Sequence, residues 1–297
     1  MSEIQTNARF KEMLDAGVHF GHLTRKWNPH MAPYIFDEKK GIHIIDLNKT
    51  AAKLDEACKA MAQVAKSGKK VLFVATKNQA RVAIEEKIGP TGMPFIVERW
   101  SGGMLTNFAT IRKAIRKMSS IDKMEADGTL NTLSKRERLQ ISRQRAKLEK
   151  NLGGIADLTR LPSAIFIVDI NKENIALLEA KKLNITTFAM VDTNSDPTKV
   201  DFPIPSNDDA SKSISVILDK IANALQEGLD ERKSTKDKQA AEKAERAAEK
   251  AKADKAEAEK AKAEAEKAKA EKAEKAKAEK AEKAEKDEKK DTKAEKA

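Results

Sequence analysis

The sequence predicts an α/β protein in which a parallel sheet is interrupted by an inserted helical hairpin and followed by a charged tail. Three observations predict this class: five short apolar runs do not alternate, amphipathic segments separate most of them, and two stretches are strongly charged. The apolar runs are rich in Val, Ile and Phe, which suits strands covered on both faces of a parallel sheet. They occupy residues 71–76, 94–98, 164–170, 187–192 and 200–204.

Helical patterns fill most of the intervals between these runs. Apolar residues spaced four and three apart from Leu47 to Ala65 predict one helix, which the Ser-Gly pair at 67–68 ends. Asn78 can cap a second, and Asp208 or Asp209 stands near the start of a last helix. The alternation predicts right-handed crossovers. Only about eight residues join the fourth and fifth runs, which is short for a parallel crossover.

Residues 108–150 depart from this alternation. Apolar residues from Phe108 to Ile121 form one helical stripe, those from Leu133 to Leu152 form a rougher second one, and an Asp-Gly pair lies between them. The apolar seam is narrow and the other faces are charged, with 12 Lys/Arg against 5 Asp/Glu. We therefore predict a coiled-coil hairpin that projects from the α/β domain.

The remaining organisation follows from composition. Residues 1–107 and 151–230 are predicted to form the α/β domain, with 1–46 as its N-terminal segment, and 231–297 to form a tail. The tail repeats Lys, Glu and Ala with a period near three, which drifts around a helix and leaves no lasting apolar stripe. A disordered chain or an isolated helix is expected there.

Charge and cysteine content narrow the class of protein. The sequence pI of about 9.4 favours a polyanionic partner without distinguishing RNA from DNA or an acidic membrane surface. The single cysteine, Cys58, cannot form an intramolecular disulfide, which suits a reducing cytoplasm. The first ten residues lack a signal peptide's apolar core, and no apolar run approaches the roughly 20 residues that span a bilayer. No membrane partner is expected.

Two polar clusters resemble metal sites, but each lacks required ligands. His19, His22 and His30 have no second cysteine or nearby acidic residue to complete a tetrahedral zinc set, so hydrogen bonds to the fold or to RNA fit them better. The segment 192–196 imitates the start of a calcium loop, but Pro197 and Pro203 stand where glycine and glutamate are required. No metal or other cofactor is predicted.

The turn at Ser101, Gly102 and Gly103 follows a strand and opens a helix. Its bare amides could bind a nucleotide phosphate or an RNA phosphate. Neither a dinucleotide fingerprint nor a P-loop is present, and a tight strand-to-helix turn explains the glycines without a ligand. Asp169 and Asp192 stand at strand ends, where α/β enzymes place their sites, but no nucleophile–base pair or carboxylate dyad can be assembled. A nucleotide-binding α/β enzyme is kept as the alternative hypothesis, although these missing motifs count against it.

Two basic segments are candidates for RNA contact. In residues 24–30, cations adjoin a tryptophan that could stack on a base or could instead anchor the core. In the hairpin, arginines and lysines at 112–113 and 116–117 occupy adjacent strips of one helix face, and five more cations crowd the return helix. An ordinary solvated face mixes charge signs. The candidate RNA-binding residues are Arg25, Lys26, Trp27, Asn28, Arg112, Arg116, Arg143 and Arg145.

Several long motifs resemble those of one family, the bacterial small-subunit ribosomal protein two family, in the same order over roughly residues 5–228. The motifs are LDAGVHFGH at 14–22, RKWNP at 25–29, MAPYI at 31–35, GIHIID at 41–46, RW at 99–100, GG at 102–103, LTNF at 105–108, VDTN at 191–194, DP at 196–197, IP at 204–205 and NDDA at 207–210.

The resemblance implies a flavodoxin-like, three-layer α/β domain with an inserted coiled-coil hairpin and no enzymatic activity. It implies a structural constituent of the small ribosomal subunit that binds small-subunit ribosomal RNA and neighbouring ribosomal proteins. It also implies help in docking ribosomal protein one where that protein is present. The expected location is the ribosome of the bacterial cytoplasm, with no small-molecule substrate. The charged tail lies outside the family core, so its function stays unassigned.

Overall fold

The computed structural model describes residues 10–238 and residue 246. The chain divides into two units, residues 1–233 and residues 234–297. In the second unit residues 234–238 are helical, and the remainder of the predicted tail, 239–245 and 247–297, lies outside the described residues. Among the described residues, no helix has both the length and the apolar character needed to cross a membrane.

The first unit is built on a five-stranded parallel sheet with the order β5-β4-β6-β7-β8. Its strands are β4 (Val71–Val74), β5 (Phe95–Ile96), β6 (Ala164–Val168), β7 (Thr186–Val191) and β8 (Phe202–Pro205). Numbered along the chain, this order is 2-1-3-4-5, the flavodoxin-like arrangement. The predicted parallel α/β sheet is thus confirmed. The short link between β7 and β8 suffices because a single 3-10 turn, η6 (Pro197–Lys199), replaces a crossover helix.

Alternate residues of the strands enter two separate cores. Phe73, Phe166 and Phe188 are in register on neighbouring strands and belong to one core. Their neighbours Leu72 and Ile165 belong to the other. Every residue of β4 and β6 is buried, which explains why these strands carry no polar alternation.

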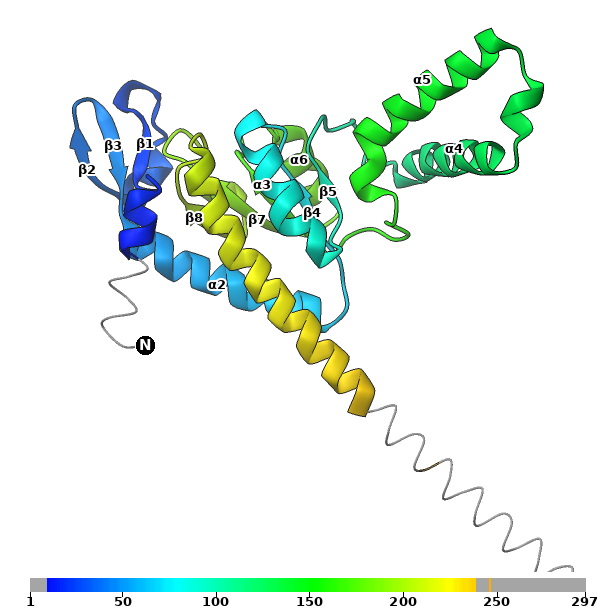
Figure 1. Ribbon diagram of the computed structural model, residues 1–297. Coiled ribbons are helices and arrows are strands. Elements are labelled where there is room, and N and C mark those ends of the chain that lie inside the picture. The colour runs from blue at the N-terminus through cyan, green and yellow to red at the C-terminus, as the bar shows by residue number, and fades with distance from the viewer. Residues whose placement is uncertain (1–9, 239–245, 247–297) are drawn as a thin grey trace, which may run out of the picture. The chain divides into compact units, whose positions relative to one another are not determined.

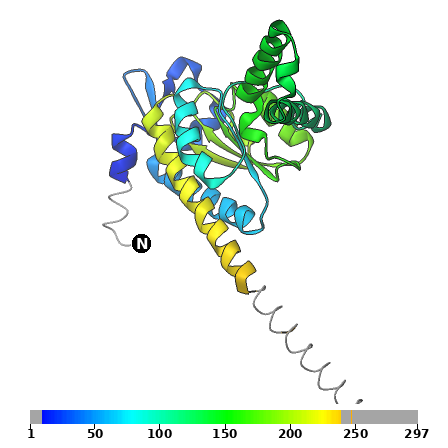
Figure 2. The same ribbon diagram turned by 45° about the vertical axis from the view of Figure 1, so that its right-hand side comes forward.

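Helices cover both faces of the sheet (Figures 1 and 2). The first core is closed by α2 (Leu47–Lys66), α3 (Asn78–Ile88) and the helix that begins at residue 211. The second core is closed by α6 (Asn174–Lys182) and by the roots of α4 (Phe108–Ala126) and α5 (Lys135–Leu152). The three-layer architecture follows from this arrangement.

The predicted helix caps were wrong at two positions. Lys77, not Asn78, precedes α3, and no side chain caps that helix. At the start of the last helix the Asn207 side chain accepts hydrogen bonds from the amides of Asp209 (2.9 Å) and Ala210 (3.3 Å). Asp208 and Asp209 turn instead towards Lys77, because an ammonium group attracts carboxylates more strongly than a backbone amide does.

A second, antiparallel sheet in the N-terminal segment was not predicted from the sequence. Its order is β1-β3-β2, from β1 (Phe20–Leu23), β2 (Ile35–Lys39) and β3 (Ile42–Ile45). Between β1 and β2 lie the 3-10 helices η1 (Thr24–Lys26) and η2 (Pro29–Tyr34). Lys40 and Gly41 form the two-residue loop of the β2–β3 hairpin, with φ of 55° and 75°. Such positive φ values match the twist of a tight hairpin.

Between β5 and β6 the chain forms α4, a turn with η4 (Thr129–Thr132) and α5. The two helices contact each other and reach away from the sheet (Figure 1). Ile115, Met118 and Ile121 of α4 are buried, whereas Leu152 is the buried residue of α5. Gly128, at the predicted Asp-Gly pair, has a φ of 72° and reverses the chain.

The start of α5 carries a capping box. The Ser134 side chain accepts a hydrogen bond from the Glu137 amide, and the Glu137 side chain accepts one from the Ser134 amide. We expect Ser134→Ala to lower the stability of α5 by about 1 kcal/mol. Faster hydrogen exchange confined to the first turn of α5 would confirm this, whereas unchanged exchange would contradict it.

Candidate nucleic-acid interface

The carboxyl edge of the sheet, where proteins of this topology bind ligands, is closed by an internal ion cluster. Lys77 Nζ lies 2.9 Å from Asp169, 2.8 Å from Asp208 and 2.9 Å from Asp209. Burial alone would lower the pKa of the Lys77 ammonium. The contacts with Asp208, Asp209 and Asp169 outweigh this effect and raise that pKa above its ordinary value. Burial, together with Asp192 and Asp169, raises the pKa of Asp208 to about 7 although Lys77 lowers it in part.

His22 extends this cluster to the N-terminal sheet. Its Nδ1 lies 2.9 Å from Asp192 and its Nε2 lies 3.3 Å from Asp209. The contact with Asp192 above all, assisted by Asp208 and Asp209 and opposed by burial, raises the pKa of His22. The strand-end aspartates Asp169 and Asp192 therefore serve a charge network that joins the two sheets.

Ligand atoms of His22, Asp208 and Asp209 lie within 4.8 Å of one another, so these side chains could hold a divalent cation. Lys77 already contacts both carboxyl groups. The predicted histidines do not converge in the described part of the chain, since His30 instead lies 3.2 Å from Asp196.

The turn at Ser101, Gly102 and Gly103 does bind an anion, and that anion is the chain's own Glu179. The Glu179 carboxylate accepts hydrogen bonds from the amides of Gly103 (2.7 Å), Leu105 (3.0 Å) and Thr106 (3.0 Å). The amides that a nucleotide phosphate would need are thus already occupied. Sequence reasoning missed Glu179, although a carboxylate on the apolar face of a helix signals a buried polar partner.

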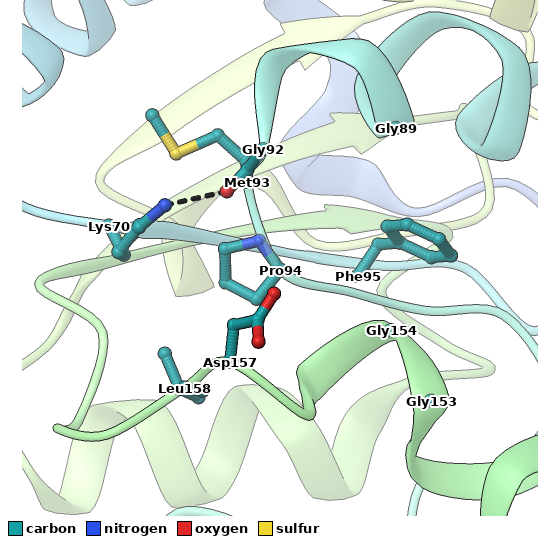
Figure 3. A pocket seen from close by; sticks show the side chains of 10 residues that line it. All are labelled: Lys70, Gly89, Gly92, Met93, Pro94, Phe95, Gly153, Gly154, Asp157 and Leu158. Carbon is teal, nitrogen blue, oxygen red and sulfur yellow. Dashed lines mark hydrogen bonds between the residues drawn. The ribbon is translucent and has the colours of Figure 1, made fainter.

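A cavity of about 230 Å³ lies at the opposite edge of the sheet, where β4 and β5 begin (Figure 3). Its polar side chains are Lys70, which donates a hydrogen bond to the Gly92 carbonyl, and Asp157. No nucleophile paired with a base lines this cavity. It therefore offers no catalytic arrangement.

The predicted RNA-binding loop lies on the surface. Arg25 and Lys26 are exposed, and among the described residues neither has a carboxylate partner. Trp27 is 40% exposed and its ring lies 5.3 Å from that of His43, so one side of the ring packs while much of it stays accessible. Asn28 caps η2 by accepting a hydrogen bond from the His30 amide (3.0 Å).

The four hairpin arginines fall into two groups. Arg116 and Arg143 are exposed and Arg112 is half-buried, and within residues 10–238 none of them pairs with an acidic side chain. Arg145, in contrast, reaches Asp122 of α4 at 2.6 Å and Glu149 of α5 at 2.7 Å. Its charge is neutralised within the hairpin, where it joins α4 to α5.

These features define an α/β protein of flavodoxin-like strand order in which internal ion pairs close the usual ligand edge and free cations gather on α4 and α5. The family described as ribosomal protein S2 matches residues 13–228. The chain therefore belongs to the ribosomal protein S2 family, whose members are structural, non-enzymatic components of the small ribosomal subunit. The enzyme hypothesis is excluded, and the family places the protein on cytoplasmic bacterial ribosomes.

Curated relatives agree with the family assignment. The chain is 65% identical over 237 residues to the small ribosomal subunit protein uS2 of Phocaeicola vulgatus, covering 80% of this chain and 85% of that protein. It is 64% identical over 231 residues to the protein of the same name from Flavobacterium johnsoniae, covering 78% of this chain and 91% of the relative. The predicted family and its non-catalytic role are thereby confirmed.

Proposed function

We propose that this protein holds small-subunit ribosomal RNA through two cationic surfaces, the loop at residues 24–30 and the α4–α5 hairpin. The observation that carries this proposal is the set of exposed hairpin cations without acidic partners in the described chain. The proposed RNA-binding residues are Arg25, Lys26, Trp27, Asn28, Arg112, Arg116, Arg143 and Arg145.

The hairpin is suited to phosphate contacts rather than to recognition of base edges. Its apolar seam is limited to a few residues such as Ile115 and Met118, so the two helices act as a narrow coiled coil with cations along their outer faces. Arginine and lysine release counterions when they neutralise phosphates, and this supplies most of the affinity that does not depend on sequence. Arg145 contributes chiefly by holding α4 against α5.

The loop adds a stacking surface to the phosphate contacts. Arg25 and Lys26 flank the accessible ring of Trp27, a combination that binds unpaired nucleotides by charge and by stacking. The hydrogen bond from the Asn28 amide to the Thr193 carbonyl (2.8 Å) fixes the loop to the sheet edge. The loop therefore presents its cations from a rigid support.

Protein partners are proposed to be neighbouring small-subunit proteins, and ribosomal protein one where that protein is present. The motif resemblance supports this proposal. Phe36 on β2 is 75% exposed beside an apolar groove formed with Leu14 and Ile44, the kind of surface that protein partners cover. Neither a membrane nor a small-molecule substrate is a proposed partner.

Sucrose-gradient sedimentation of native extracts at low and high salt tests this function. We expect the protein to migrate with small subunits at low salt and to be partly released at high salt, because the phosphate contacts weaken as salt rises. Recovery of nearly all the protein from the top fractions at low salt would contradict the proposal.

A further inference from the structure

The strand-to-helix turn between β5 and α4 is held by a single buried carboxylate. Glu179 of α6 is 8% exposed and accepts five hydrogen bonds from this segment. Besides the three amides, the donors are the Trp100 indole N–H (3.1 Å) and the Thr106 hydroxyl (3.1 Å). Burial tends to raise the pKa of Glu179, but these donors outweigh it and keep the pKa below its ordinary value.

α4 depends on this turn for its direction because its own start is weakly fixed. Asn107 precedes the helix, and its side chain makes no capping hydrogen bond to a backbone amide. The Asn107 amide instead donates to the Gly103 carbonyl at 2.8 Å, so the first turn of α4 continues directly from the segment that Glu179 binds. The start of α4 is therefore linked directly to the residues that Glu179 contacts.

The other root of the hairpin is anchored independently. Gly154, just after α5, packs so closely on the Phe95 carbonyl that an added Cβ would lie 2.2 Å from it. Lys150 of α5 lies 3.5 Å from Glu98. Loss of the Glu179 contacts would therefore loosen the start of α4, whereas the root of α5 keeps these contacts.

From this geometry we infer that Glu179 is a positioning residue for RNA binding: it fills the turn at residues 101–106 and sets the direction in which α4 presents its cations. The inference rests on the proposed role of the hairpin. Glu179 supplies an internal anion to the amides of this glycine-containing turn. RNA then meets a preorganised surface, which lowers the cost of ordering it.

The test measures hairpin position without RNA. Spin labels at Ser119 of α4 and Lys59 of α2, both exposed, are placed in the full chain with Cys58→Ser, and their distance distribution is recorded. We expect a narrow distribution in the parent and a broader one in Glu179→Ala. An excess of acetate, which matches the methylene and carboxylate that Glu179→Ala removes, should narrow the Glu179→Ala distribution, whereas chloride at equal ionic strength should not.

Three matched variants separate positioning from a general effect on the fold. Glu179→Gln keeps the side-chain size but presents an amide donor to the N–H groups, so it should broaden the distance distribution. Acetate should not reverse this effect, because the glutamine side chain fills the space. Glu179→Asp keeps the charge but shortens the side chain, and should give a distribution of intermediate width. It serves as the test if Glu179→Ala fails to fold. Glu85→Ala removes an exposed carboxylate from α3 and should leave the width unchanged.

RNA affinity provides the second readout. If about one molecule in ten keeps the productive orientation, the apparent affinity of Glu179→Ala for small-subunit RNA falls about tenfold, and acetate restores it. Distributions as narrow as the parent's in both Glu179→Ala and Glu179→Asp would overturn the inference. A broadened distance distribution with unchanged RNA affinity would instead support the positioning of α4 by Glu179 and contradict the role of the hairpin in RNA binding.

Discussion

Replacing Lys77 by methionine is expected to lower the free energy of unfolding by about 3–5 kcal/mol. The ammonium contacts three carboxyl groups, and two of them, on Asp169 and Asp208, have side chains that are 9% and 0% exposed. Methionine fills similar space but leaves these charges without a counterion. Urea denaturation of the full chain, compared with the parent at equal pH, measures the effect.

The loss should grow as pH rises. The pKa of Asp208 is about 7 in the folded protein, above its ordinary value of 3.8. Protonation of Asp208 therefore stabilises the folded state fully below pH 3.8, and this stabilisation is lost as the pH rises through about 7. Without Lys77 the neutral form of Asp208 is favoured further. We therefore expect Lys77→Met to be more destabilising at pH 8 than at pH 5.

Two comparisons make the Lys77 result specific. Lys87 lies 2.8 Å from Asp219, but both side chains are more than a third exposed, so Lys87→Met should lower the free energy of unfolding far less than Lys77→Met does. Adding Asp208→Asn to Lys77→Met removes one of the orphaned charges and should recover part of the loss. Equal effects of Lys77→Met and Lys87→Met would show that the cluster adds nothing beyond a surface ion pair.

The sequence predicted the structure correctly where one local pattern of apolar residues was sufficient. The runs around Phe73, Phe166 and Phe188 are buried on both faces, so their apolar character alone identified the central strands. The N-terminal sheet escaped prediction because its strands are short and largely exposed, as on β2, where four of five residues face solvent. Such strands carry no continuous apolar signal, and their pairing depends on the turn at Lys40 and Gly41.

Polar networks were predictable only in part. Asp169 and Asp192 were recognised as strand-end residues, but the sequence could not show that Lys77, 92 positions before Asp169, pairs with that residue. Nor could it show that His22, 170 positions before Asp192, pairs with the other. The hydrogen bonds of Glu179 could not be predicted for the same reason, since their donors lie more than 70 positions away in the sequence. Contacts between residues so far apart in the sequence are determined by the fold and not by a local sequence pattern.

Neutralising the free cations of the hairpin is expected to have the largest effect on binding. In Arg112→Ala/Arg116→Ala/Arg143→Ala the plot of log binding constant against log salt should become shallower by about one unit for each lost phosphate contact. At low salt the affinity for small subunits depleted of this protein should fall on the order of a hundredfold if all three contacts exist. Titrations at several salt concentrations measure both quantities.

A variant with the same charge change elsewhere decides whether position or net charge matters. Lys59, Lys181 and Lys182 are exposed on α2 and α6 and belong to neither proposed surface. Their replacement by alanine should alter the slope far less, because only screened long-range attraction is lost. Arg145→Ala should behave differently again. Since Arg145 is paired with Asp122 and Glu149, its loss should loosen the packing of α4 on α5 and lower their helicity, without removing a full unit of slope. A control triple as damaging as the hairpin triple would mean that total charge, not the hairpin, attracts the RNA.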